Sequence, residues 1–372
     1  MSPAVDEAEL YLGLMSGTSL DGIDAVLAEI TPSKTHLVAH YYLPYPKDLR
    51  LQLLNLHSAQ NNEIHLAALA AQQLAHRYAE SVQALLVQAG KNKTDIRAIG
   101  CHGQTLRHRP EAGYTLQIGN AALLTELTGI TVVADFRSRD IAAGGQGAPL
   151  VPAFHAQVLR HPTLHRVIVN IGGVANITDL PPAGPVRGWD TGPGNMLMDA
   201  WIHQHEGASY DKSGAWAARG KMNAVLLDKL LNHDFLNLPP PKSAGREQFN
   251  LDYLQTLLSG LHDPIGPVDV QATLLEFTAQ SLCDAIKKEC AGVQEVYVCG
   301  GGVHNDALMQ RIAALLAPVT VRSTGTAGID PDWMEALAFA WLARQTMHGL
   351  TSNLPEATGA RGARILGAIY PA

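Results

Sequence analysis

The sequence lacks the motifs of several well-defined enzyme classes. Its two Gly-Lys pairs are followed by Asn92 and Met222 rather than by Ser or Thr, which excludes a Walker A loop. The G-x-G-x-x-G pattern is absent from the Gly-rich strand ends, so a Rossmann dinucleotide site is not expected. A G-x-S-x-G elbow fails at Ser19, because Asp21 occupies the second glycine position. The 16 histidines include no H-E-x-x-H, which excludes a zincin.

Cysteine, charge and long apolar runs are also scarce. The 372 residues include four cysteines and no C-x-x-C pair, a usage typical of reduced thiols in a cytoplasmic protein. Charged residues make up 16% and the net charge is −7, which argues against a nucleic-acid partner. No apolar run is long enough for a bilayer, and the N-terminus lacks the features of a signal peptide. We therefore expect a cytoplasmic protein without a membrane partner.

Two stretches share one layout. Residues 11–30 and 166–180 each consist of an apolar run, a Gly-containing connection and a second apolar run, which predicts a β-hairpin. Elsewhere, predicted strands, among them residues 96–101 and 114–118, alternate with predicted helices, among them one capped by Asn120 and running to Leu127 and one over residues 306–316. This alternation indicates an α/β fold with mixed sheets. The length favours two domains, and residues 142–149, rich in glycine, are interpreted as a boundary or hinge.

Three Gly-rich loops follow predicted strands, at residues 17–22, 172–173 and 300–302. Three such loops in a two-domain chain favour a nucleotide held in an interdomain cleft. In the first loop, Gly17 and Gly22 would let the backbone approach a phosphate, and Asp21 and Asp24 could hold Mg²⁺ or its waters. The alternative is that all three are ordinary tight turns.

Asp190 is the leading candidate for a general base, because it ends an apolar strand and glycines follow it. The alternative is a capping or turn aspartate. Glu335, near the start of a predicted helix, could equally stabilise the helix dipole. Arg137 and Arg139 could clamp a carboxylate or belong to a buried ion-pair network. His102 is a candidate donor to a sugar or phosphate, or a satisfied local histidine.

Six motifs together resemble the anhydro-N-acetylmuramic acid kinase family. They are residues 13–22, 102–105, 144–150, 192–195, 245–247 and 333–335. The resemblance implies two duplicated αβ lobes of the actin/hexokinase/Hsp70 (ribonuclease H-like) type around an interdomain cleft. We expect residues 1–139 plus about 350–372 to form the N-terminal lobe and residues 140–349 the C-terminal lobe.

The resemblance also implies a reaction in peptidoglycan recycling. ATP and water would convert 1,6-anhydro-N-acetylmuramic acid to N-acetylmuramic acid 6-phosphate and ADP. Asp190 matches the family's base and Glu335 a carboxylate of the cleft. Charge neutralisation during phosphoryl transfer implies Mg²⁺, near Asp21 and Asp24 and bound through water. A homodimer is a candidate assembly.

The remaining predicted contacts fall into two groups. Those to ATP are Gly17, Thr18, Ser19, Leu20, Asp21, Gly22, Ile23, Asp24, Gly172, Gly173, Gly300, Gly301 and Gly302. Those to the sugar are His102, Thr105, Arg139, Gly194 and Asn195, with Arg139 the candidate for the lactyl carboxylate. Other functions remain open: another sugar kinase of the superfamily, an actin- or Hsp70-like ATP-driven binding protein, or a plain glycosidase.

Overall fold

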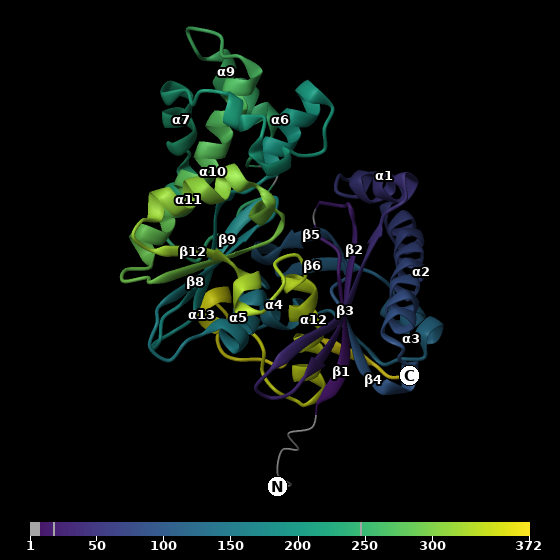
Figure 1. Ribbon diagram of the computed structural model, residues 1–372. Helices are drawn as coiled ribbons and strands as arrows, with labels where there is room; N and C mark the ends of the chain where they lie inside the picture. Colours follow the sequence, from purple (N-terminus) through teal and green to yellow (C-terminus); the bar gives the residue numbers. More distant parts are fainter. Residues whose placement is uncertain (1–7, 18, 246–247) are drawn as a thin grey trace. The chain divides into compact units, whose positions relative to one another are not determined.

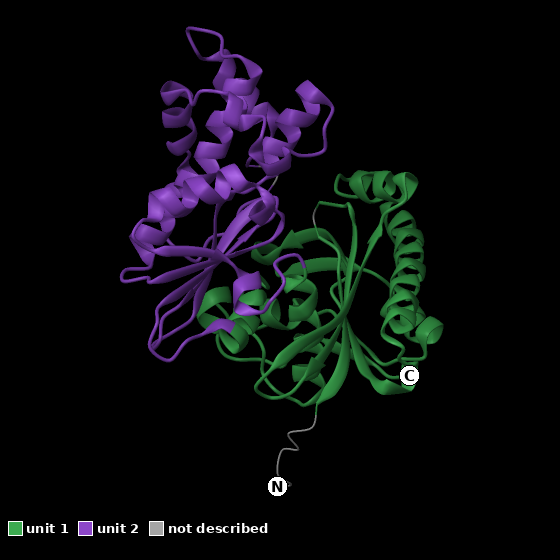
Figure 2. Ribbon diagram, in the orientation of Figure 1, with its two compact units in different colours: residues 1–158, 333–372 green, residues 159–332 purple. Residues whose placement is uncertain are grey.

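The computed structural model describes residues 8–17, 19–245 and 248–372. The chain divides into two compact units, coloured separately in Figure 2: Met1–Val158 with Trp333–Ala372, and Leu159–Asp332. Within the described ranges, no helix has both the length and the apolar composition needed to cross a membrane.

The first unit is built on a six-stranded sheet with the order β13-β7-β4-β1-β2-β3. Its strands are β1 (Glu9–Met15), β2 (Gly22–Ile30), β3 (Thr35–Pro44), β4 (Ile96–Cys101), β7 (Val132–Ala134) and β13 (Ala368–Tyr370). A separate hairpin pairs β5 (Gln104–Arg109) with β6 (Tyr114–Ile118). The helices are α1 (Lys47–Asn55), α2 (Glu63–Ala89), α3 (Ala121–Thr128), α4 (Ser138–Ala142), α5 (Val151–Leu159), α12 (Met334–Met347) and α13 (Pro355–Thr358).

Helix α12 packs unusually close to this sheet. Leu12 and Leu14 belong to the core with α2, which covers one face, while α12 lies on the other (Figure 1). On that face, a Cβ on Gly13 would lie 1.9 Å from the carbonyl oxygen of Ala336. One on Gly100 would lie 2.0 Å from the carbonyl oxygen of Phe339. The absence of side chains at both positions therefore lets the helix backbone rest on β1 and β4.

The second unit is built on a five-stranded sheet with the order β10-β9-β8-β11-β12. Its strands are β8 (Arg166–Ile171), β9 (Val174–Leu180), β10 (Arg187–Pro193), β11 (Glu295–Cys299) and β12 (Thr320–Ser323). The helices are α6 (Met196–Glu206), α7 (Ala224–Leu231), α8 (Asp234–Asn237), α9 (Leu251–Ser259), α10 (Pro267–Glu289) and α11 (Asp306–Leu316). The core joins apolar side chains of β8, β9 and β11 to those of α6, α7, α10 and α11.

The two sheets repeat one topology. In each, the first three strands are antiparallel neighbours, and the fourth runs parallel to the first and beside it. A fifth strand runs parallel to the fourth, β7 in one unit and β12 in the other. The expected pair of duplicated α/β units with mixed sheets is confirmed, as are both opening hairpins.

The units differ from the lobe boundaries expected at residues 139 and 349. Residues 140–158 and 333–349 cluster with the first unit, the latter because α12 packs on β1 and β4. The Gly-rich loop of residues 142–149 is also tied down inside this unit. The buried Asp140 carboxylate accepts hydrogen bonds from the Gly147 amide (2.8 Å), Thr358 Oγ1 (2.7 Å) and Asn353 Nδ2 (2.7 Å). This loop therefore lies within the first unit and not at the division between the two units.

Candidate functional site

The predicted site residues of the first unit follow the carboxyl ends of β1 and β4. Ser16 and Gly17 come directly after β1, and His102 comes directly after β4. Because these strands are parallel neighbours, both connections leave the same edge of the sheet, where ligands of α/β proteins bind.

A buried hydrogen-bond network supports the connection after β1 from beneath. Ser16 Oγ lies 2.7 Å from the Tyr78 hydroxyl and donates to the Gly103 carbonyl oxygen (3.0 Å). Gln104 Nε2 donates to the Gly17 carbonyl oxygen (3.0 Å), and the Tyr45 hydroxyl donates to Gln104 Oε1 (3.3 Å). These side chains are all buried, so the start of the loop has a fixed backbone path.

The acidic end of this connection is open to solvent. The exposed Asp21 accepts at Oδ1 from Ser19 Oγ (2.6 Å) and from the Gly22 amide (3.0 Å). Asp24 lies partly buried on β2. Leu20 is buried with φ of 57°, a strained conformation for a branched side chain of the kind found at ligand-binding turns. Thr18 lies outside the described residues.

The predicted glycines separate into two kinds. At Gly22, Gly194, Gly300 and Gly302 a Cβ would collide with the chain itself, at 2.5, 2.3, 2.4 and 2.4 Å respectively. Packing within the protein therefore explains these four. At Gly17, Gly172, Gly173 and Gly301 the nearest atoms to a Cβ lie at 3.6 to 3.9 Å, and Gly173 and Gly301 are exposed. The second set is the one whose backbone a ligand can approach.

His102 is fixed by the protein's own groups. Arg137 donates to its Nε2 through Nε (3.1 Å) and Nη2 (2.9 Å), so that nitrogen carries no proton. Its Nδ1 then carries the proton and donates to the Ser16 carbonyl oxygen (3.3 Å). Burial and the neighbouring Arg137 charge lower the pKa of His102 to about 3, so the ring is neutral. Both nitrogens are engaged, as in the alternative of a satisfied local histidine.

Glu335 lies in the first turn of α12, partly buried. Burial raises the pKa of its carboxyl, and the charge of Arg137 opposes that rise. Arg137 itself donates to the Gly147 carbonyl oxygen (2.8 Å), and burial lowers its pKa to about 10. One guanidinium thus connects His102, the 142–149 loop and the electrostatic surroundings of Glu335.

Two predicted sugar contacts of this unit, Arg139 and Thr105, differ in whether their side chains already bond to the protein. Arg139 is exposed on α4, and no hydrogen bond or ion pair joins its guanidinium to the described part of the chain. Thr105 on β5 is half-buried, and its Oγ1 accepts from Gln117 Nε2 (3.2 Å). Arg137 therefore belongs to the buried hydrogen-bond network, whereas the exposed guanidinium of Arg139 is placed to bind an anion.

In the second unit, Asp190 lies on β10 just before a register shift in its pairing with β9. Its Oδ2 accepts from the Ala244 amide (2.8 Å), and its own amide donates to the Lys242 carbonyl oxygen (3.0 Å). No hydrogen bond from the described residues reaches its Oδ1. Burial raises the pKa of Asp190 to about 7, with the Ala244 hydrogen bond and the Lys242 charge acting in the opposite direction. A carboxylate with such a pKa can exchange a proton near neutral pH.

We call residues 242–244 the strap, because they run beside Asp190 and bond to it at both main chain and side chain. They belong to the loop that the sequence showed only as Pro-rich. Arg246 and Glu247 of the 245–247 motif lie outside the described residues. Sequence reasoning missed both the strap and Gln104, although Gln104 stands inside the 102–105 motif.

The glycine connections of the second unit pack against one another. The Gly194 amide donates to the Gly173 carbonyl oxygen (2.8 Å), and the Asn195 amide to that of Gly172 (2.8 Å). Asn195 precedes α6, but its side chain donates to the Ile171 carbonyl oxygen (3.1 Å) instead of capping the helix. These contacts hold the 172–173 and 194–195 turns together at one end of the sheet.

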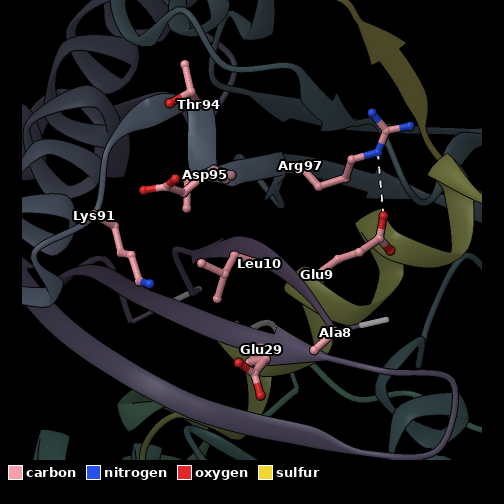
Figure 3. Close-up of a pocket in the computed structure, with 9 residues that line it drawn as sticks. Ala8, Glu9, Leu10, Glu29, Lys91, Thr94, Asp95 and Arg97 are labelled. Carbon is pink, nitrogen blue, oxygen red and sulfur yellow. Dashed lines mark ion pairs between the residues drawn. The ribbon is translucent and has the colours of Figure 1, made fainter. Parts of the chain in front are cut away.

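A hollow of about 530 Å³ in the first unit contains none of the predicted site residues (Figure 3). It lies at the amino ends of β1 and β4, beside Glu9 and Ile96, and thus at the opposite edge from Ser16 and His102. An ion pair joins Arg97 Nε to Glu9 Oε1 across 3.7 Å at its rim. Among the described residues, no group of three or more His, Cys, Asp or Glu side chains could hold a metal ion.

Known proteins resemble the chain over nearly all of its length. A sequence model of the anhydro-N-acetylmuramic acid kinase family matches residues 9–372. A protein of that name from Thiobacillus denitrificans is 70% identical over 367 residues, which is 98% of this chain and 98% of the relative. Another of the same name, from Nitrosospira multiformis, is 54% identical and covers 98% of this chain and 100% of its own.

Proposed function

The chain belongs to the anhydro-N-acetylmuramic acid kinase family, and from that premise we propose the reaction it catalyses. With ATP and water it opens the 1,6-anhydro ring of 1,6-anhydro-N-acetylmuramic acid and phosphorylates O6. The products are N-acetylmuramic acid 6-phosphate and ADP, as needed for peptidoglycan recycling. One observation of the site supports the mechanism: Asp190 has a pKa of about 7, and its Oδ1 receives no hydrogen bond from the described residues.

Asp190 acts as the general base. Its carboxylate takes a proton from water, the water oxygen forms a bond to C1, and the C1–O6 bond breaks with its electrons on O6. O6 then attacks the γ-phosphorus of ATP, and the bond to the ADP oxygen breaks. The protonated Asp190 later returns its proton to solvent. Its raised pKa suits this cycle, because the group is near half-ionised at neutral pH.

Glu335 acts as the second carboxylate of the site, orienting the water or the sugar. Burial raises the pKa of this carboxyl, while its place in the first turn of α12 and the charge of Arg137 favour the ionised form. The exposed Arg139 is the candidate partner of the sugar's lactyl carboxylate, and its planar guanidinium suits a bidentate contact. Thr105, Gly194 and Asn195 remain proposed sugar contacts, and His102 acts through Ser16 and Arg137.

The connection after β1 binds the phosphates of ATP. Gly17, supported by Gln104, leaves its backbone open to a phosphate, and Ser19 adds a hydroxyl. The proposed nucleotide contacts of the second unit are Gly172, Gly173 and Gly301, whose nearest neighbours leave room for a ligand to approach the backbone. The remaining proposed nucleotide residues shape the loops that carry these contacts: Leu20, Gly22, Ile23, Gly300 and Gly302.

Asp21 and Asp24 fit a Mg²⁺ ion held partly through water. Mg²⁺ usually keeps several waters and uses one or two carboxylates together with substrate phosphates, so a large protein ligand set is not needed. When bound, Mg²⁺ neutralises charge on the β- and γ-phosphates.

We also propose that the protein acts in the cytoplasm and as a homodimer. Among the described residues, the four cysteines are buried and form no disulfide bond, which is consistent with a reducing compartment. Exposed apolar side chains on α1 and α2, Leu51, Leu54 and Ile64, offer a surface for self-association. Light scattering on the purified protein measures the assembly.

The test is a product assay with ATP, Mg²⁺ and anhydro-N-acetylmuramic acid in ¹⁸O-water. The expected product carries ¹⁸O at C1 and phosphate at O6, in one-to-one ratio with ADP. Turnover of a free sugar hydroxyl with no label at C1 would identify another sugar kinase. Ring opening without ATP would identify a glycosidase, and ATP consumption that no sugar stimulates would identify an ATP-driven binding protein.

A further inference from the structure

Lys242 has no role in the reaction described above, yet its ammonium is anchored. Nζ donates to the carbonyl oxygens of Phe235 (2.9 Å) and Leu236 (3.0 Å), and lies 4.6 Å from the centre of the Phe235 ring. The carbonyls belong to α8, whose Phe235 is buried in the core. The side chain thus ties the strap to the core of the second unit.

The strap in turn fixes Asp190 at two points. The Lys242 carbonyl oxygen accepts from the Asp190 amide, and the Ala244 amide donates to Oδ2. Only Oδ1 is left without a hydrogen bond from the described residues. A main-chain donor on one oxygen directs the incoming water to the other.

We propose that Lys242 is a positioning residue for Asp190, and that its anchored strap makes Oδ1 the oxygen that accepts the proton from water. This inference rests on the proposed function, in which Asp190 is the base. Lys242 acts in two ways: its contacts hold the strap in place, and its positive charge favours the ionised carboxylate.

Few charged groups of the described residues act on Asp190. Lys242 is the charged group that acts on Asp190 and lowers its pKa against the effect of burial. Lys242 faces Lys288 and Glu289 of α10 in addition to Asp190. Removing the Lys242 charge therefore raises the pKa of Asp190, and a higher pH is then needed to ionise the base.

The experiment compares the full-length Lys242→Met variant with the parent protein by the pH dependence of kcat. We expect the acid limb of the profile to move up by about one pH unit. We also expect kcat at neutral pH to fall by about 10- to 100-fold, with KM for ATP unchanged. Lys288→Met, which removes a nearby exposed charge without touching the strap, is the matched control and should leave the limb in place.

The Lys242→Arg variant keeps both the positive charge and the hydrogen-bond donors. Its acid limb in the pH profile of kcat should therefore lie close to that of the parent protein, which would not be expected if the lysine only filled space. It also serves if Lys242→Met fails to fold, as judged by circular dichroism. An unmoved acid limb in Lys242→Met overturns the inference, and so does a raised KM for sugar or ATP with that limb unchanged. The Asp190→Asn variant separates failure of the proposed base from failure of the Lys242 role. Full activity of Asp190→Asn would refute Asp190 as the base. An inactive Asp190→Asn together with an unmoved acid limb in Lys242→Met would refute only the role of Lys242.

Discussion

Asp190 in the second unit and Glu335 in the first are both partly buried carboxylates with a cation nearby, but the two cations are held in different ways. Burial raises the pKa of both, and one cation opposes the rise at each. At Glu335 that cation is a guanidinium locked by His102 and Gly147. At Asp190 it is an ammonium that belongs to the same strap that bonds to the carboxylate.

The difference suits different tasks. A base must change its charge in every turnover, and Asp190, with a pKa of about 7 and one oxygen bonded by a neutral amide, can do so. At Glu335, burial raises the pKa, whereas the positive charge of Arg137 and the place in the first turn of α12 favour the ionised form. Under the proposed function, similar burial would therefore serve a proton acceptor in one unit and an orienting carboxylate in the other.

Replacing each carboxylate by its amide tests this contrast most strongly. Asp190→Asn should lower kcat by about 10³-fold, because the proton acceptor is lost, while ATP still binds. Glu335→Gln should lower it less, by about 10²-fold, since orientation and not proton transfer is removed. Stopped-flow kinetics and ATP-binding calorimetry measure both. The exposed Asp228→Asn is the control, and equal losses in the two site variants would refute the division of roles.

The stability of Asp190→Asn should depend on pH in a defined direction. The folded protein holds a proton on Asp190 up to about pH 7, whereas the unfolded chain releases it near the ordinary pKa of 3.8. The parent protein therefore loses unfolding free energy as pH rises between these values. Relative to the parent, the variant should gain up to about 2 kcal/mol from pH 4 to pH 7, after discounting for the partial solvent access of the carboxyl.

Urea unfolding at pH 4.5 and pH 8 measures this difference. Glu335→Gln provides the comparison, because the nearby Arg137 offsets part of the burial penalty and its gain should be smaller. A gain for Asp190→Asn that is constant with pH would show that the carboxyl has an ordinary pKa in the folded protein.

Arg137→Lys should have the smallest effect. Lysine keeps the charge but replaces a planar fork by a single nitrogen, so the contacts to His102 and Gly147 cannot all be kept. We expect kcat/KM to fall about 10-fold, or about 1.4 kcal/mol. Steady-state kinetics measure it against Arg109→Lys, an exposed control on β5. An unchanged kcat/KM would show that charge alone suffices at this position.

Local patterns predicted the elements well where one segment specifies its own structure. Strands β4 and β6 and helix α11 have the predicted bounds. Asn120 caps α3 as predicted, because its side chain accepts a hydrogen bond from the Leu123 amide. Strand β5 was missed because its residues, Gln104–Arg109, are mostly polar, and they gain strand structure from pairing with β6.

Contacts between distant segments could not be predicted. The need for glycine at position 22 comes from β3, where Leu43 and Tyr42 occupy the space of a Cβ, and not from a ligand. The loop of residues 142–149 reads as a hinge locally, yet Asn353 and Thr358 fix it through Asp140. The strap likewise contains no motif for holding a carboxylate, because its donor is the backbone amide of Ala244.

The contact of α12 with Gly13 and Gly100 has a consequence for protein engineering. Any side chain at either position would enter the helix backbone, so a randomised library would return glycine at both sites. Glu335 lies in the first turn of that helix, and the connection after β1 follows that strand directly. The backbone contact between α12 and β1 therefore helps to fix the positions of both. Under the proposed function, efforts to alter substrate preference have more freedom at the exposed Arg139 of α4, where a new side chain meets solvent.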